Sequence, residues 1–172
     1  MMARGPNSEM ARKRGAKILA EILGFACTNN GGDLIHPDIE GIKQTLRMTL
    51  KDANLHPEQI DFISAHATGT KMGDVIEAEA IRSIYGESPY VTALKGYMGH
   101  TMGSCGVIET ILCIYMMEEG IIAPTLNLEE VDGRCDIIRH TMELREKPVK
   151  TSAIQNFAFG GVNTCLFIRK YE

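Results

Sequence analysis

The sequence predicts an α/β fold in which a mixed β-sheet carries helices on both faces and closes with a C-terminal hairpin. Short apolar runs that fit buried strands alternate along the chain with longer segments whose apolar residues recur at helical spacing. Near the end, strand-like runs at 151–159 and 164–169 flank Gly160-Gly161-Val162-Asn163, a spacing typical of a β-hairpin.

The composition fits one globular domain. The chain has 172 residues, of which 44% are hydrophobic and 23% charged, enough to bury a core. A net charge of -4 argues against a nucleic acid or an acidic membrane as partner. No stretch approaches the ~18 consecutive apolar residues that a membrane span needs. The first residues lack the apolar core of a signal peptide, so we expect a cytoplasmic location.

The five cysteines are odd in number and widely spaced, and no two have the spacing of a CxxC motif. Neither a zinc site nor a disulfide framework is therefore indicated. Cys113 lies in an apolar helical pattern and Cys165 in an apolar strand pattern. Both are predicted to be buried small hydrophobic residues.

The first third of the chain contains two predicted helices and one long predicted strand. Residues 11–14 are expected to end a short helix that stops at Gly15. Residues 16–27 fit a strand, although their imperfect alternation leaves a helix as an alternative. After a loop at 28–37, a helix is predicted from Pro37 to Ala53, with Asn54 as its stop.

The remainder alternates strands with helices up to the hairpin. Strands are predicted at 60–65 and 90–94, helices at 74–85 and 106–119, and a short extended piece at 123–128. A glycine follows each of the two helices, as expected for a helix C-terminus.

Two histidines occupy corresponding places in this pattern. His66 and His100 each lie in a glycine-rich, nearly uncharged stretch that follows a predicted strand and precedes a predicted helix. Two such turns can point two neutral nitrogen donors into one pocket, where they can stabilise a carbonyl oxygen as it becomes an enolate. No obvious nucleophile accompanies them. A lone histidine is more often a satisfied core residue, and only the presence of two in matching contexts favours a catalytic role.

Several motifs occur in a recognisable order. They are Ala11-Arg12-Lys13-Arg14-Gly15-Ala16-Lys17-Ile18, His66-Ala67-Thr68-Gly69-Thr70 with Gly73-Asp74 and Glu77, Lys95 with Gly99-His100, Pro124-Thr125-Leu126-Asn127-Leu128, and Phe157-Ala158-Phe159-Gly160-Gly161-Val162-Asn163. With them the chain resembles the C-terminal half of a β-ketoacyl-[acyl-carrier-protein] synthase, a type II condensing enzyme. The resemblance implies one half of a thiolase-like fold at 11–172, with 1–10 outside the core.

The resemblance also implies a reaction, the decarboxylating Claisen condensation of fatty acid or polyketide synthesis. In this acyltransferase family a cysteine of the N-terminal half takes the acyl chain, so that half is an expected partner. Acyl carrier protein is the other, and its phosphopantetheine arm delivers the substrates. No permanently bound cofactor and no metal are expected, because neither histidine has a ligand at short spacing.

The same resemblance suggests roles for single residues. His66 and His100 match the two catalytic histidines, both expected to donate hydrogen bonds to the enolate. Lys95 matches an active-site lysine, and Glu109 an acid that pairs with it. The alternative is a solvated lysine and an exposed glutamate. A buried ammonium without a partner costs too much, so we expect a Lys95–Glu109 pair.

Further positions match the substrate channel. Thr68 and Thr70 match residues that contact the phosphopantetheine arm, although both also suit a turn. Phe157 and Phe159 lie where the family has a glycine-rich loop with a gating phenylalanine, and Phe159 is the better candidate. Ala158 replaces the usual glycine, and its Cβ is expected to strain a positive φ.

The start of the chain departs from the family. A strand precedes the first helix there, whereas Met1 to Ser8 contains no apolar run, so we expect this strand to be missing and a sheet edge to be exposed. Two other functions stay open. The chain can be a non-catalytic assembly or chain-length partner of a ketosynthase, or an inactive truncated homologue.

Overall fold

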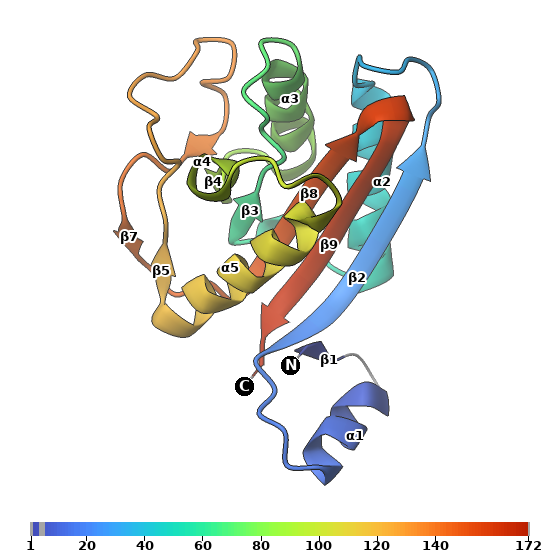
Figure 1. Ribbon diagram of the computed structural model, residues 1–172, viewed down its shortest axis with the longest axis vertical. Helices are drawn as coiled ribbons and strands as arrows, with labels where there is room; N and C mark the ends of the chain where they lie inside the picture. The colour runs from blue at the N-terminus through green and yellow to red at the C-terminus, as the bar shows by residue number, and fades with distance from the viewer. Residues whose placement is uncertain (1, 4–5, 172) are drawn as a thin grey trace.

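A seven-stranded mixed sheet organises the molecule, and helices cover both of its faces (Figure 1). The computed structural model describes residues 2–3 and 6–171. The strand order is β1-β2-β9-β8-β3-β4-β6, and β5 pairs with β7 in a separate two-stranded sheet. The predicted fold class is confirmed.

The long antiparallel strands form one side of this sheet. β8 (Thr151–Ala158) and β9 (Val162–Lys170) form the predicted hairpin, and β9 pairs in turn with β2 (Ala20–Asn29). The strand prediction for 16–27 is therefore right in kind, and the helical alternative is wrong. The strand begins and ends later than predicted because its pairing with β9 reaches from Ala20 to Asn29.

The parallel strands form the other side. β3 (Phe62–Ser64) lies between β8 and β4 (Tyr90–Thr92), and β4 is followed by β6 (Arg139–His140). All of these neighbours run parallel to one another. Their carboxyl ends therefore open at one edge of the sheet, where the loops to the next helices begin.

Two helices pack on one face of the sheet. α2 (Ile39–Ala53) begins at Asp38, whose side chain accepts hydrogen bonds from the backbone of Glu40 and Gly41. It ends at Asn54, which adopts the left-handed conformation at φ 53°. α3 (Gly73–Tyr85) lies beside it. Both contribute to a core that includes Ile42, Leu46, Ile63, Ile81 and Phe167.

A single long helix covers the opposite face. α5 (Cys105–Glu119) crosses the front of the sheet in Figure 1. It buries Cys113, Ile114 and Met117 against Phe62 and Ile168. As predicted, Cys113 and Cys165 are buried. The sheet is thus a hydrophobic layer between two helical layers.

The remaining elements are short. They are β1 (Met2–Ala3), α1 (Pro6–Lys13), α4 (Lys95–Met98), β5 (Ile121–Ile122), β7 (Arg145–Glu146), and the 3-10 turns Pro57–Gln59, Met102–Ser104 and Phe159–Gly161. The predicted extended piece at 123–128 includes a turn at 126–127, where Asn127 has φ 63°.

The strand expected to be missing before the first helix is present as β1, so that expectation is wrong. β1 pairs in parallel with β2 at Ala20 and Glu21. Backbone pairing of two residues needs no apolar run, which is why the sequence pattern did not reveal it. Across the part of the chain that the structure describes, no helix is long and apolar enough to cross a membrane.

Candidate functional site

The two histidines meet at the carboxyl edge of the parallel strands. His66 lies two residues after β3, and His100 follows β4 and α4. Because β3 and β4 are paired with Ser64 opposite Thr92, the turns that follow them start side by side. The ring centroids of His66 and His100 are 5.5 Å apart, with the ring planes nearly perpendicular at 88°. One small substrate group can therefore contact both rings.

The His100 ring is held by contacts from its own turn. The backbone N–H of Met102 donates to Nδ1 of His100 at 3.2 Å, and Sγ of Cys105 lies 3.1 Å from the same nitrogen. Met102 adopts a positive φ of 55° in the turn that makes this contact. Since Nδ1 accepts a backbone hydrogen bond, the neutral ring carries its proton on Nε2. The exposed ring therefore offers an N–H donor to the pocket.

The His66 turn is held from α3 instead. The carboxylate of Glu77 accepts hydrogen bonds from the backbone N–H groups of His66 and Ala67, both at 2.8 Å. Asp74 accepts in the same way from Gly69 at 3.2 Å and Thr70 at 3.3 Å. Burial raises the pKa of Glu77 to about 7, opposed by the two backbone hydrogen bonds. Burial likewise raises the pKa of Asp74.

The ring of His66 has different neighbours from that of His100. Its Nδ1 lies 3.4 Å from Oδ1 of Asn156, and its centroid lies 5.8 Å from that of Phe157. Burial, and then the positive charge of Lys95, lower the pKa of His66 to about 4. The imidazole is therefore neutral near neutral pH.

A buried ion pair is connected to the His66 ring through Asn156. Nζ of Lys95 donates to Oε1 of Glu109 at 2.6 Å, as predicted, and the two side chains are 6% and 0% exposed. The second oxygen of Glu109 accepts from Nδ2 of Asn156 at 2.9 Å. Both carboxylate oxygens thus have donors, the condition under which a buried carboxylate is tolerated.

The predicted substrate-contacting residues lie at the rim. Thr68 and Thr70 are exposed, and their hydroxyl oxygens are 3.4 Å apart. Phe159 is 72% exposed in the connection between β8 and β9, whereas Phe157 is half-buried beside His66. The structure thus brings Phe157 to the ring of His66 and leaves Phe159 exposed to solvent.

Three features of the site were not predicted. The bridging side chain of Asn156 and the clamp from Glu77 act across the fold, so neither leaves a local pattern in the sequence. The prediction of backbone strain at Ala158 is wrong, because this residue is extended with φ -113°. The strained residue is Ala67, at φ 30° beside the catalytic candidate His66.

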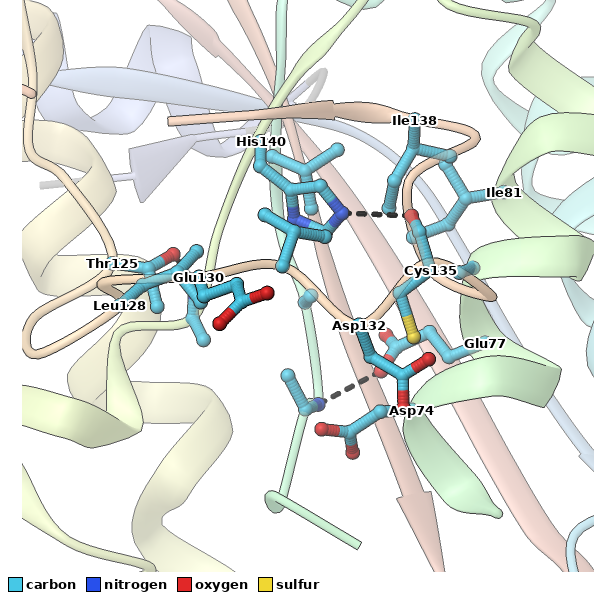
Figure 2. A pocket seen from close by; sticks show the side chains of 16 residues that line it. Asp74, Glu77, Ile81, Thr125, Leu128, Glu130, Asp132, Cys135, Ile138 and His140 are labelled. Carbon is cyan, nitrogen blue, oxygen red and sulfur yellow. Dashed lines mark hydrogen bonds between the residues drawn. The ribbon is translucent and has the colours of Figure 1, made fainter. Parts of the chain in front are cut away.

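A separate cavity lies behind the His66 turn (Figure 2). Its volume is about 260 Å³, and its lining includes Ala65, Ala67, Glu77, Cys135 and His140. His66 itself is not part of that lining. The cavity therefore lies on the Ala67 side of the turn, away from the pocket between the two rings. Within the described ranges 2–3 and 6–171, no group of three or more His, Cys, Asp or Glu residues can hold a metal ion.

Comparison with known proteins identifies similar chains over nearly the whole length. The C-terminal domain of beta-ketoacyl synthases matches residues 19–129, a range that includes Lys95 and both histidines of the pocket. The 3-oxoacyl-[acyl-carrier-protein] synthase 1 of Escherichia coli K12 is 37% identical over 165 residues, and Nodulation protein E of Rhizobium sp. N33 is 35% identical, also over 165 residues.

Solved structures agree with these matches. A beta-ketoacyl synthase from Burkholderia phymatum superimposes with a TM-score of 0.92 at 39% identity, covering 95% of this chain and 40% of its own. The ishigamide ketosynthase/chain length factor gives a TM-score of 0.91 at 37% identity, covering 95% of this chain and 41% of its own. The chain likewise spans about 40% of the length of the curated relatives, with 95% of its own residues aligned to the E. coli protein.

Proposed function

The chain belongs to the β-ketoacyl synthase family and carries its C-terminal domain, and from this premise we propose that it supplies His66, His100 and Lys95 to the condensation site of a 3-oxoacyl-[acyl-carrier-protein] synthase. The nucleophilic cysteine lies outside these 172 residues, on the N-terminal half of such a synthase. The observation that carries the proposal is the pair of perpendicular imidazoles 5.5 Å apart, together with a buried ammonium–carboxylate pair that reaches His66 through Asn156.

The chemistry begins with a malonyl thioester whose carbonyl oxygen faces the histidines. The bond between the α-carbon and the carboxylate breaks, carbon dioxide leaves, and the electron pair moves onto the thioester oxygen as an enolate. Nε2–H of His100 points a donor at that oxygen, and a preorganised donor of this kind contributes roughly 3–4 kcal/mol to the transition state.

The enolate then forms the new carbon–carbon bond. Its α-carbon attacks the acyl thioester on the cysteine of the N-terminal half, the carbon–sulfur bond breaks, and the cysteine leaves as thiolate. Lys95 does not reach the substrate in this account, because Glu109 holds its ammonium in the interior. Burial, and then the charge of Lys95, lower the pKa of His66, so that this ring is neutral before the substrates react.

The acyl carrier protein is the proposed source of both thioesters. Its phosphopantetheine arm enters past Thr68 and Thr70, whose exposed hydroxyls can bond the amides of the arm. The exposed ring of Phe159 is proposed to gate this entrance. No resident cofactor takes part.

An exposed apolar stripe on α5 supports the N-terminal half as a partner. Val107, Ile111 and Tyr115 lie one turn apart on a helix that is otherwise mainly buried, and they are 64%, 46% and 60% exposed. Apolar side chains in register on one helix face favour burial against another surface. We assign that surface to the N-terminal half, which brings its cysteine to the edge where the histidines lie.

The test uses the chain together with an N-terminal ketosynthase half that carries the cysteine. The assembled protein should decarboxylate malonyl-carrier protein and transfer the product to the cysteine-bound acyl group. His100→Ala should lower decarboxylation by about 10²–10³-fold, the usual loss for one oxyanion donor. The matched control is His56→Ala, an exposed histidine just before β3, at the other end of that strand.

The outcomes separate the proposal from its alternatives. A stable complex that neither decarboxylates nor condenses supports an assembly or chain-length partner. No complex and no activity supports an inactive homologue. Decarboxylation that is unchanged in His100→Ala contradicts the role given to His100.

A further inference from the structure

Asn156 connects the buried ion pair to the His66 ring. It lies on β8, opposite Thr164 of β9, with its side chain between α5 and the His66 turn. Nδ2 of Asn156 donates to Oε2 of Glu109 at 2.9 Å, and Oδ1 lies 3.4 Å from Nδ1 of His66. A single amide therefore faces a carboxylate on one side and an imidazole nitrogen on the other.

Glu109 decides which way this amide points. The carboxylate of Glu109 faces the ammonium of Lys95 and can only accept hydrogen bonds, so the amide group that meets it has to be the NH₂. The carbonyl oxygen of Asn156 is then left to face His66. A carbonyl oxygen can only accept as well, so the hydrogen bond forms when Nδ1 of His66 carries the proton.

We propose that Asn156 is a positioning residue that holds neutral His66 in the tautomer protonated at Nδ1, leaving Nε2 as an acceptor. His100 is held in the opposite tautomer, because its Nδ1 accepts from the backbone of Met102. The pocket then contains one imidazole donor and one imidazole acceptor, instead of the two donors that the family resemblance led us to expect.

The chemical consequence rests on the proposed function. His100 alone donates to the enolate oxygen, and Nε2 of His66 is free to act as a base. When the cysteine of the N-terminal half attacks the carrier-bound acyl thioester, its S–H proton moves to Nε2 of His66. The new carbon–sulfur bond forms, the bond to the carrier arm breaks, and the proton passes from His66 to the departing pantetheine thiolate.

The test reads the tautomer directly in the 172-residue chain. Two-bond ¹H–¹⁵N spectra at pH 7 distinguish protonated from bare imidazole nitrogens, and His66→Gln and His100→Gln assign the two rings. His66 should be protonated at Nδ1 and His100 at Nε2. A wild-type His66 protonated at Nε2 overturns the inference, whatever any variant does.

Two variants then isolate the amide. Asn156→Leu removes both polar contacts at similar volume, and His66 should change to the Nε2–H form, which free imidazole prefers. The hydrogen bond to Asn156 raises the pKa of His66, so its loss in Asn156→Leu should not raise that pKa. If the variant only loosened the site, the loss of burial would instead let the pKa of His66 return toward 6.5. Thr164→Val is the matched control: it removes a hydrogen bond to the backbone oxygen of Asn156 and leaves the side chain in place.

These results separate the inference from the proposed function, since the spectra need no substrate. Unchanged His66 tautomers in Asn156→Leu overturn the role of Asn156, even in a chain that supports condensation. Conversely, the assembled protein can fail to condense while the chain shows the predicted tautomers. That result would reject the proposed function and leave the role of Asn156 supported.

Discussion

The turns that carry His66 and His100 occupy equivalent places in the fold but are stabilised in different ways. The His66 turn depends on residues outside it. Glu77, 11 residues on in α3, clamps its backbone, and Asn156, 90 residues on in β8, contacts its ring. The His100 turn depends on its own residues, because Met102 and Cys105 provide the contacts to the ring.

This difference shows how one sheet edge can hold two imidazoles in different states. Local backbone contacts are formed as soon as the His100 turn folds, and they fix its donor. The state of His66 is set only after α3, α5 and β8 have packed together. The Lys95–Glu109 pair contributes to the His66 side, because Asn156 connects it to the His66 ring.

The largest expected effect comes from breaking the Lys95–Glu109 pair. Glu109→Gln leaves the buried ammonium of Lys95 without an anion, and the loss of one partner of a buried pair costs about 3–5 kcal/mol. Urea denaturation of the chain measures the change. Glu40→Gln, which breaks a surface pair with Lys43, should cost no more than about 0.5 kcal/mol. A loss below about 1 kcal/mol for Glu109→Gln would mean that the pair behaves like a surface pair.

The next largest effect should separate the two turns. Glu77→Ala removes the acceptor of two backbone N–H groups in a buried position, and we expect a loss of about 2 kcal/mol. In ¹H–¹⁵N spectra the His66 ring should shift while the His100 ring stays unchanged. Ser104→Ala, which removes one exposed hydroxyl contact from the His100 turn, should cost about 0.5 kcal/mol. Equal losses would contradict the contrast between the turns.

Two groups of the His66 turn, the imidazole of His66 and the carboxyl group of Glu77, give stability opposite pH dependences. The pKa of His66 is lowered from 6.5 to about 4, so the unfolded chain binds this proton first and stability falls as the pH drops through that window. The pKa of Glu77 is raised from 4.5 to about 7, so the unfolded chain loses that proton first and stability falls as the pH rises from 4.5 to 7.

Single substitutions should reveal how each group changes the free energy of unfolding between pH 4.5 and pH 6.5. Relative to the parent, His66→Gln should become less stable as the pH rises, and Glu77→Gln more stable, each by at most about 1.4 kcal/mol per pH unit. Denaturant midpoints measured across this range provide the profiles, with exposed His56→Gln as control. Parallel profiles for all three variants would show that neither group has a perturbed proton equilibrium.

The smallest effect tests the backbone of the His66 turn. Ala67 has φ 30°, where a Cβ is strained, so Ala67→Gly should stabilise the chain by up to about 1 kcal/mol. Ala158 is extended at φ -113°, so Ala158→Gly should destabilise it by about 0.5–1 kcal/mol. Thermal unfolding should therefore show a higher melting temperature for Ala67→Gly and a lower one for Ala158→Gly. A lower melting temperature for both variants would mean that Ala67 is not strained.

The sequence was sufficient for the regular elements because their signals are local. The spacing of apolar residues and the stop at Asn54 predicted α2 to within two residues, and the glycines after Phe159 predicted the β8–β9 hairpin. β1, β6 and β7 were missed since each has only two residues, too few for any period to appear.

The site was predictable where motifs have fixed spacing. The family motifs suggested His66, Lys95 and His100 as site residues. The same resemblance suggested Glu109, and the argument that a buried lysine needs an anion supported it. Asn156 was not identified, because its partners lie 47 and 90 residues away in the chain. The strain was assigned to Ala158 instead of Ala67 because φ depends on the path of the folded backbone.

The central claim is that His66 and His100 act in one pocket on one reaction, and a double-mutant cycle tests it most directly. The rates of malonyl-carrier decarboxylation and of condensation are measured in the assembled synthase for His66→Gln, His100→Gln and the double variant. We expect each single variant to lose condensation. The double variant should be only slightly slower than the less active single variant, because the effects of substituting residues that act as a unit are not additive. Losses that multiply, or a single variant with full activity, would contradict it.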